Sequence, residues 1–423
     1  MDKEILRYLQ ARGIKGPWKI CGTDRADFTG AIVIPALAEA DYLWNTLKSL
    51  AQNPAEILDK FLTLIVVNHR QDAPPEIKKN NLDTLRMLAT RKDSLQNLPR
   101  AWVDAASPGL ELPPNGGVGF ARKIGFDLAL EKLNYQNNSP LLISLDADTL
   151  VRPDYLPALM HHFQNFSVGA AIIPFCHQQG STIAEDQAIK RYELFLRAYV
   201  FGLKLAGSPY AFHTIGSTMA CTAAAYVRAG GMNTRSAAED FYFLQQLAKT
   251  SGLKQVKGTI VYPAARASWR VPFGTGKSVL KILTSPSGTI KFYQTACFQV
   301  LKNWLDLTSQ HIDLSTGKIQ KMAGEISPAL VDFLSRIHFP EVWPKLQKNY
   351  HSLPQLQSAF HIWFDGLKTL QLIHYLSAGP FPKAEPEEVL PSLWQWAGLA
   401  PPVTFAEHLS LLRRLQIGED YQD

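Results

Sequence analysis

An alternation of buried strands and helices, beginning near residue 30, constrains the fold of this chain more than any other feature. Apolar runs predict strands at Ala31–Leu37, where Pro35 ends the run, and at 61–69, 141–148, 168–175 and 258–268. Helical periodicity fills the intervals between these runs. Strands without polar alternation, separated by helices, build a mostly parallel sheet with helices on both faces. The sequence therefore predicts an α/β fold.

After about Ser278 the strand-like runs disappear, and helical periodicity continues to the end of the chain between Pro and Gly residues. We expect an N-terminal helix with a connecting segment over residues 1–29, a sheet domain over 30–278 and a helical C-terminal domain over 279–423. A length of 423 residues suits two or three domains at about 150 residues each.

Composition excludes several classes of protein. Hydrophobic residues make up 46% and charged residues 19%, which fits neither a disordered chain nor a coiled coil. A net charge of +6 is too small and too dispersed to predict nucleic-acid binding. Residues 1–285 carry 32 basic and 24 acidic side chains, whereas residues 286–423 carry 11 and 13. We expect an anionic ligand on the first part of the chain.

Targeting signals are not visible in the sequence. It shows neither a signal peptide nor an apolar run of about 18 residues, and its four cysteines lack paired spacing. These features predict a cytoplasmic protein. The segment Tyr192–Phe212 mixes aromatic, aliphatic and basic residues, which is compatible with peripheral contact at the inner face of a membrane. A buried helix is the favoured interpretation.

The run ISLDADTLVRPDYL carries the sharpest chemical signal. Asp146 and Asp148 follow an apolar strand, at the end of the strand where open α/β sheets bind their ligands. Two adjacent carboxylates repel each other, and their oxygens suit Mg²⁺ or Mn²⁺ completed by substrate phosphates. The pattern predicts a site for a metal and a diphosphate, although an aspartate turn without a ligand gives the same triplet.

A second acidic pair, Glu239 and Asp240, opens an amphipathic helix. Acidic residues at a helix N-terminus stabilise the helix dipole, which is the structural interpretation. In the functional interpretation, one carboxylate accepts the proton of an attacking hydroxyl as a general base.

Two glycine-containing segments suit phosphate groups. Gly117 and Gly119 precede Arg122 and Lys123, so backbone amides and positive charge lie at one helix start. The spacing is not a dinucleotide fingerprint, because Arg122 stands where a third Gly or Ala is required. A turn with solvated basic residues is the alternative.

The second segment, SWRVPFGTGKSV, is not a P-loop, because Val271 replaces the first glycine of that motif. Gly274 and Gly276, flanked by Arg270 and Lys277, suit a loop that closes over a diphosphate. An ordinary connection between domains is the alternative.

Three histidines in or just after the sheet domain, His177, His213 and His311, are candidates for a third metal ligand. None has a diagnostic spacing, and a structural or surface role is favoured for each.

In their order, these segments resemble the family 2 glycosyltransferases, which have the GT-A fold. The similarity includes the opening strand with its proline turn (residues 31–50), the second strand (64–74), the helix at 117–130 and the segment 216–233. LDAD and AED resemble the family's D-x-D and E-D motifs, and SWRVPFGTG resembles a loop that several members carry. The similarity spans roughly Thr29 to Lys277.

This resemblance implies transfer of a sugar from a UDP- or GDP-sugar to an acceptor hydroxyl, with inversion at the anomeric carbon. It implies that Asp148 holds Mn²⁺ or Mg²⁺ on the diphosphate, that Asp146 contacts the ribose or the cation, and that Asp240, beside Glu239, is the base. The implied donor-binding residues are Pro35, Ala36, Glu39, Asn68, Gly119, Arg122, Lys123, Asp146, Arg270, Gly274, Gly276 and Lys277.

The sequence departs from the family in two places. Asn68, His69 and Arg70 precede Asp72 where the family has an Asp-containing turn that contacts the base, and the Gln-x-x-Arg-Trp motif of processive synthases is missing. A non-processive enzyme is implied. Three alternatives stay open: a retaining enzyme like the glycerate-linked sugar synthases, a non-catalytic sugar-nucleotide-binding module, and a sugar nucleotidyltransferase. Pro35 to Glu39 lacks the glycine-rich loop of the last.

Overall fold

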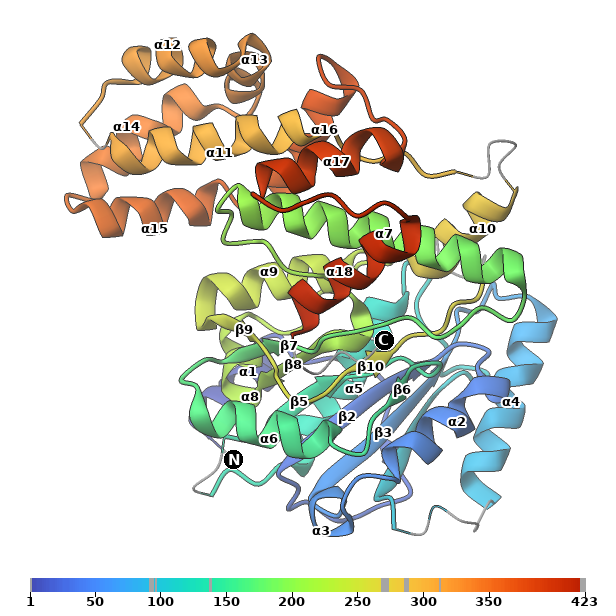
Figure 1. The fold of residues 1–423 in the computed structure, drawn as a ribbon. Coiled ribbons are helices and arrows are strands. Elements are labelled where there is room, and N and C mark those ends of the chain that lie inside the picture. Colours follow the sequence, from blue (N-terminus) through green and yellow to red (C-terminus); the bar gives the residue numbers. More distant parts are fainter. Residues whose placement is uncertain are drawn as a thin grey trace. The chain divides into compact units, whose positions relative to one another are not determined.

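The structure is a computed structural model that describes residues 2–90, 95, 97–136, 139–267, 274–284, 289–311 and 313–418 (Figure 1). Its contacts divide the chain into two compact units. The sheet unit comprises Met1–Ile189, Thr214–Leu283 and Gln416–Asp423, and the helical unit comprises Lys190–His213 and Thr284–Leu415.

The sheet unit is built on an eight-stranded sheet with the strand order β1-β4-β3-β2-β5-β8-β7-β9. The strands are β1 (Ile20–Cys21), β2 (Gly30–Ala36), β3 (Phe61–Asn68), β4 (Arg100–Ala105), β5 (Leu141–Ser144), β7 (Ala170–Ile172), β8 (Met219–Thr222) and β9 (Leu253–Gln255). β4, β3, β2 and β5 are mutually parallel, whereas β8 runs antiparallel to β5 and β7. The predicted α/β class with a mostly parallel sheet is confirmed.

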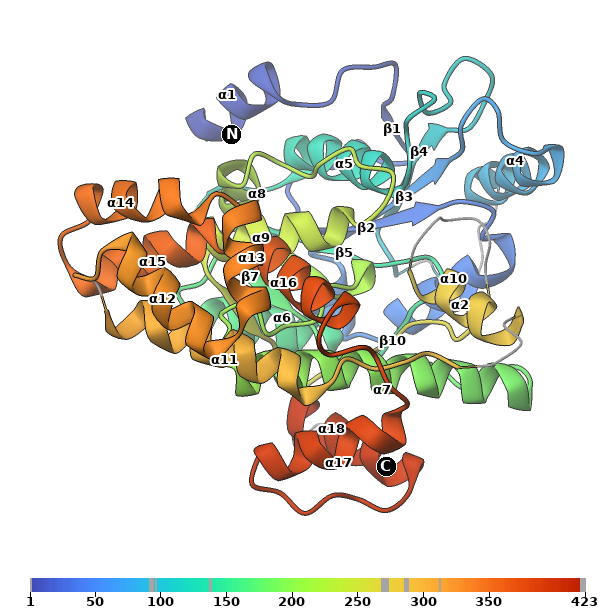
Figure 2. The same ribbon diagram turned by 90° about the horizontal axis from the view of Figure 1, so that it is seen from above.

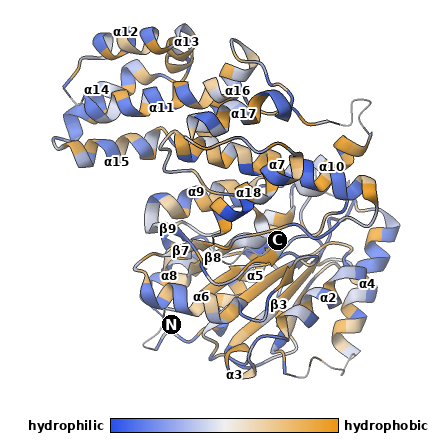
Figure 3. Ribbon diagram, in the orientation of Figure 1, coloured by the Kyte–Doolittle hydropathy of each residue, from blue (hydrophilic) through white to orange (hydrophobic). Residues whose placement is uncertain are grey.

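The central strands β2, β3 and β5 are apolar because they are covered on both faces. Every residue of β3 is buried, and its ribbon is hydrophobic over most of its length (Figure 3). Figures 1 and 2 show α1 and α5 on one face of the sheet and α2 and α6 on the other. Gly125 of α5 lets this helix approach the sheet closely, because a Cβ there would lie 2.3 Å from Val33 Cγ1.

The helices of the sheet unit connect its strands. They are α1 (Lys3–Ala11), α2 (Ala40–Leu50), α3 (Ala55–Leu58), α4 (Pro75–Thr90), α5 (Val118–Ala129), η1 (Leu130–Lys132), α6 (Tyr155–Asn165), η2 (Gly216–Thr218), α8 (Ala223–Arg228), α9 (Glu239–Ser251) and α10 (Thr275–Thr284). α7 (Ile183–Leu205) begins in the sheet unit and continues into the helical unit, and α18 (Phe405–Ile417) does the reverse.

Several strand predictions need correction. Pro35 does not end the first strand, because β2 continues to Ala36. A proline fits there because β5 pairs with β2 only as far as Val33, so the missing N–H interrupts no bond to β5. The last predicted strand, Gly258–Ser268, is reduced to β10 (Val261–Tyr262), which pairs with β6 (Leu150–Val151) in a separate small sheet. The sequence interpretation missed β4 entirely.

The helical unit contains α7 from Lys190 onward, most of α18 and seven further helices that belong to it completely. These are α11 (Thr295–Gln310), α12 (Thr316–Ile326), α13 (Pro328–Arg336), α14 (Phe339–Asn349), α15 (Leu353–Trp363), α16 (Gly366–Ala378) and α17 (Pro386–Trp396). Their amphipathic faces enclose fully buried tryptophans, among them Trp304, Trp343 and Trp394. Leu194, Ala198 and Phe201 of α7 pack in the cluster that contains Trp394.

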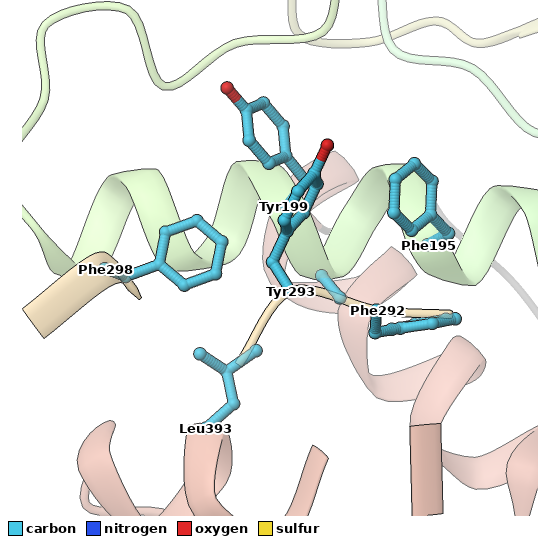
Figure 4. Close-up of a pocket in the computed structure, with 7 residues that line it drawn as sticks. Phe195, Tyr199, Phe292, Tyr293, Phe298 and Leu393 are labelled. Atoms are coloured by element: carbon cyan, nitrogen blue, oxygen red, sulfur yellow. The ribbon is translucent and has the colours of Figure 1, made fainter. Parts of the chain in front are cut away.

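A small cavity lies inside the helical unit (Figure 4). It is lined by aromatic rings of α7, of α11 and of the segment before α11, and by Leu393 of α17. Its volume of about 10 Å³ is no more than one water molecule needs. The cavity is therefore a packing gap in an aromatic core.

The domain limits expected from the sequence differ from the two compact units. The helical unit takes Lys190–His213 from within the expected sheet domain 30–278. The N-terminal segment 1–29 belongs to the sheet unit, where Tyr8 of α1 donates a hydrogen bond to Asp127 of α5 (2.9 Å). Among the described residues, none of the helices combines the length and apolar character needed to span a bilayer.

Candidate functional site

The strand order places a topological switch point between β2 and β5. From β2 the chain proceeds to β3 and then β4 on one side, whereas β5 lies on the other side. Open α/β sheets bind ligands at the carboxyl ends of the strands at such a point. Glu39 follows β2, and Asp146 and Asp148 follow β5, so three acidic side chains come from the two strands that flank the switch point.

The turn that carries Asp146 and Asp148 is held by its backbone. The Thr149 amide donates to the Asp146 carbonyl (3.1 Å), which closes a tight turn after β5. The hydroxyl of Thr46 on α2 donates to the Ala147 carbonyl (2.9 Å). The side-chain amide of Gln178 donates to the Asp148 carbonyl (2.9 Å). The two carboxylates are therefore presented from a fixed turn, not from the extended strand that the sequence predicted.

Arg122 of α5 ties this turn to the AED segment. Its Nη2 pairs with Asp146 Oδ1 and its Nη1 with Glu239 Oε1, and its side chain is only 3% exposed. Burial alone would lower the pKa of Arg122, but Asp146 and Glu239 raise it above its ordinary value. Burial raises the pKa of Asp146, which Arg122 opposes. A single guanidinium thus positions one carboxylate from each acidic motif.

Gly216 makes room for this guanidinium. A Cβ on Gly216 would lie 2.0 Å from Arg122 Nη2, so η2 can pass the arginine only with glycine at this position. Gly117 and Gly119 serve a similar purpose at the start of α5. A Cβ on Gly117 would meet the Ser236 backbone at 2.8 Å, and one on Gly119 the Arg235 carbonyl at 2.6 Å. These glycines admit the segment that leads into α9.

Asp240 lies in the first turn of α9 next to Glu239. Burial, followed by the negative charge of Glu239, raises the pKa of Asp240 from 3.8 to about 7. Its Oδ1 accepts a hydrogen bond from the Phe241 amide (2.7 Å). Glu239 is committed to Arg122, whereas Asp240 is partly exposed, so Asp240 is the better placed of the pair to accept a proton.

Two strained alanines precede the acidic residues of the site. Ala38 before Glu39 (φ 54°) and Ala238 before Glu239 (φ 57°) have left-handed backbone, which is costly for a residue with a Cβ. The Ala38 amide donates to Asn81 Oδ1 (2.8 Å), which helps to hold its turn. Backbone conformations of this kind are concentrated at functional sites, where the orientation of a side chain is constrained.

Arg266 completes the site from the segment after β10. Its Nη2 lies 2.6 Å from both carboxylate oxygens of Glu39 and 2.7 Å from Asp148 Oδ2. Its guanidinium carbon lies 4.1 Å from the centroid of the Tyr42 ring. Sequence interpretation missed this residue, and its one signal was an isolated basic side chain in the small-residue run PAARAS.

Several residues expected to bind a donor are engaged in structural contacts instead. Lys123 Nζ pairs with Asp127 Oδ2 (2.8 Å) and donates to the Tyr8 hydroxyl (2.8 Å), so its charge is used within a buried cluster. The Asn68 amide donates to the carbonyls of Ala36 (3.3 Å) and Val66 (3.0 Å). Pro35 and Ala36 are buried within β2. We therefore assign these residues to the framework of the site.

The glycine-containing segment after β10 is partly helical. Gly274 has left-handed backbone (φ 107°), but Gly276 and Lys277 lie in the first turn of α10, and Lys277 is exposed. Arg270 lies outside the described residues. The expected loop is thus a helix start from Thr275 onward.

A divalent cation fits the oxygen donors of this site. Asp146 and Asp148 each carry a guanidinium on a carboxylate oxygen, which marks these oxygens as places where positive charge is stabilised. Mg²⁺ and Mn²⁺ take carboxylate oxygens and commonly use one or two of them together with substrate phosphates. Within the described ranges, no three His, Cys, Asp or Glu side chains are grouped to hold a metal.

Of the three histidines considered as metal ligands, only His177 belongs to the sheet unit. Its ring packs edge-on against Phe175, with 5.2 Å between the ring centroids. His213 and His311 belong to the helical unit. The structure therefore adds no support for a histidine ligand.

Comparison with known proteins gives structural matches of low similarity. No family model and no curated protein sequence matches the chain. Among solved structures, S. aureus TarS 1-349 in complex with UDP-GlcNAc is similar at 13% identity over 93% of each chain, with a TM-score of 0.37. Mannosyltransferase PcManGT from Pyrobaculum calidifontis, in complex with GDP-Man and Mn²⁺, is similar at 16% identity over 89% of this chain and 92% of that chain, with a TM-score of 0.36. TM-scores this low do not establish a common fold.

Proposed function

We propose that this chain is a GT-A-type glycosyltransferase, similar to family 2, that transfers a sugar from a UDP- or GDP-sugar to an acceptor hydroxyl with the help of Mn²⁺ or Mg²⁺. The observation that carries this proposal is the bridge made by Arg122. It joins Asp146 of the LDAD turn to Glu239 of the AED segment at the carboxyl end of the sheet. The two acidic motifs therefore belong to one site, as a transferase with separate donor and base groups requires.

The donor side of the proposed site contains Asp146, Asp148 and Glu39. We propose that Asp148 holds the cation and that Asp146 contacts the donor ribose or the cation. The cation would offset negative charge on the nucleoside diphosphate as it leaves. Arg266 brings a protein cation to the same place, since it lies on Asp148 and Glu39. The basic excess of residues 1–285 also favours an anionic ligand in this part of the chain.

The acceptor side of the proposed site is Asp240. We propose that its carboxylate accepts the proton of the acceptor hydroxyl while the hydroxyl oxygen bonds to the anomeric carbon and the bond to the diphosphate oxygen breaks. A pKa of about 7 suits this task, because a general base is most effective when its pKa is near the working pH. Glu239 and Arg122 would hold the start of α9 in place for this step.

The finer features of the reaction are part of the same proposal. Inversion, a non-processive mode and a cytoplasmic location follow from the resemblance and the sequence composition. Proton NMR of the product decides between inversion and retention, because the two mechanisms give opposite anomeric configurations.

A thermal-shift screen tests the proposed function. UDP, GDP and their sugar conjugates are added to the protein with and without MnCl₂, since a ligand that binds the native state raises Tm. We expect one base to raise Tm in the presence of Mn²⁺ and EDTA to reverse the metal-dependent part. Asp148→Asn should lose that part, whereas Arg152→Gln, which removes a charge paired with Asp154, should keep it. No shift with any nucleotide would contradict the proposal.

A further inference from the structure

Arg266 Nη2 is surrounded by three carboxylate oxygens from two residues. Both oxygens of Glu39 lie at 2.6 Å and Asp148 Oδ2 lies at 2.7 Å, while Arg266 Nε adds a second contact to the same Asp148 oxygen at 3.1 Å. The exposed fractions of the three side chains are 12% for Glu39, 22% for Asp148 and 20% for Arg266. Two mostly buried carboxylates thus share one positive group, which offsets only part of their negative charge.

The position of this cluster follows from the topology. Glu39 comes after β2 and Asp148 after β5, the two strands that flank the switch point. The Gln178 amide bonds both the Asp148 carbonyl (2.9 Å) and the Tyr262 carbonyl (2.7 Å), which fixes the start of the segment that carries Arg266. The Tyr42 ring supports the guanidinium at 4.1 Å. The Tyr42 ring is thus a contact of the guanidinium in addition to its two ion pairs.

The same oxygens suit a divalent cation. Carboxylate oxygens are the preferred ligands of Mg²⁺ and Mn²⁺, and two facing carboxylates without a cation repel each other. Asp148 Oδ2 accepts from two nitrogens of Arg266, so this oxygen is occupied on the side that faces Glu39. A guanidinium and a metal ion cannot occupy the same position between the two carboxylates at the same time.

We propose that Arg266 is an internal counter-ion that a divalent cation displaces from Asp148 and Glu39, so that Glu39 joins Asp148 as a metal ligand. The inference rests on the proposed function for its premise that the site takes a metal. Glu39 and Asp148 would then hold the cation between them without a histidine ligand. Arg266 offsets part of the negative charge of the two carboxylates until the metal enters, and the need to displace it makes metal binding weaker than two free carboxylates would give.

Titration calorimetry of Mn²⁺, in the absence of any nucleotide, tests this inference. Arg266→Gln removes the competing cation, and we expect the Kd for Mn²⁺ to fall about tenfold or more, as loss of a charge-assisted hydrogen-bond network predicts. Arg152→Gln is the matched control, because it removes the same charge from an arginine that pairs with Asp154 (2.6 Å). Its Kd should equal that of the wild type. Adding Asp148→Asn to Arg266→Gln should abolish the gain.

A second variant covers the case in which repulsion between Glu39 and Asp148 unfolds Arg266→Gln. Arg266→Lys keeps the charge but loses the two-pronged contact with Asp148, and its Kd for Mn²⁺ should lie below that of the wild type. Unchanged Mn²⁺ affinity in the folded Arg266 variants, or a gain that survives Asp148→Asn, would overturn the inference. The nucleotide screen separately decides the proposed function, since this titration contains no nucleotide.

Discussion

Asp146 and Glu239 share one guanidinium, that of Arg122, although they belong to different motifs of the sequence. The side chains of Arg122 and Glu239 are 3% and 5% exposed, while that of Asp146 is 33% exposed. Arg122 therefore pairs with the buried Glu239 of α9 and also holds Asp146, whose side chain lies at the more exposed edge of the site.

Replacing Arg122 should destabilise the protein and impair the site together. Arg122→Gln leaves the buried Glu239 without its cation, and removal of one partner from a buried pair typically costs about 3–5 kcal/mol. Urea unfolding measures this loss. The double variant Arg122→Gln/Glu239→Gln should recover part of the stability, because the carboxylate left behind is then neutral.

The surface pair of Arg152 and Asp154 provides the control for this prediction. Both side chains are about one-third exposed (34% and 37%), so Arg152→Gln should change stability by less than about 1 kcal/mol. If Arg122→Gln is as stable as Arg152→Gln, the bridge does not hold the site together.

Asp240 should give the enzyme and its stability a dependence on pH. We expect kcat/KM to rise with pH through an apparent pKa of about 7, because the ionised carboxylate is the form that accepts a proton. Asp240→Asn should keep donor binding and lose transfer. A purified Asp240→Asn variant with normal turnover would remove this residue from the base role.

The same pKa shift predicts the sign of a stability effect. Folding raises the pKa of Asp240 from 3.8 to about 7, so between these values the folded protein binds the proton more tightly than the unfolded chain. The free energy of unfolding should therefore fall as the pH rises through this window. Asp240→Asn should gain stability relative to the wild type above pH 7, which thermal melts across the pH range measure. Asp72→Asn, at an exposed residue paired with Arg70, should show no such gain.

Gly216→Ala should disturb Arg122 from the opposite side. The added Cβ would lie 2.0 Å from Arg122 Nη2, and the guanidinium cannot move without losing a carboxylate partner. We expect a loss of about 1–3 kcal/mol in the free energy of unfolding, together with reduced activity. Gly317→Ala is the control, because an added Cβ there meets nothing within 4 Å. Equal behaviour of the two variants would contradict the proposed contact.

The helical unit contains a buried ion pair of its own. Glu193 is fully buried and accepts from Arg197 Nε (2.7 Å) and Arg413 Nε (2.6 Å). Glu193→Gln should lower the free energy of unfolding by about 3 kcal/mol, because two guanidiniums lose a shared carboxylate. Asp306→Asn, whose partner Lys302 is 41% exposed, should cost about 1 kcal/mol or less. Denaturant unfolding that gives equal losses for both would contradict this interpretation.

The fold was predictable where burial leaves a plain signal in the sequence. β2, β3 and β5 are covered on both faces and therefore read as continuous apolar runs. β4 was missed because its residues alternate between buried and half-buried, so RAWVDA shows no apolar run. The strand at β10 was predicted too long, because an apolar segment can be buried without forming sheet hydrogen bonds along its whole length.

The site was predictable only where its residues are neighbours in the sequence. The acidic residues form two short motifs in the sequence. One contains Asp146 and Asp148, and the other contains Glu239 and Asp240. The partners of these acids come from distant segments, because α5 delivers Arg122 and the chain after β10 delivers Arg266. No local pattern encodes such pairing. Arg122 was therefore expected to meet a phosphate, and Arg266 was overlooked.

Release of nucleoside diphosphate from UDP- and GDP-sugars tests the central claim most directly. We predict that the wild type and Arg152→Gln, with water taking the place of the acceptor hydroxyl, release UDP or GDP from at least one sugar nucleotide in the presence of Mn²⁺, and that Asp148→Asn and Asp240→Asn do not. Failure of the wild type to release either nucleotide, or wild-type rates in both aspartate variants, would contradict the assignment of this site to sugar transfer.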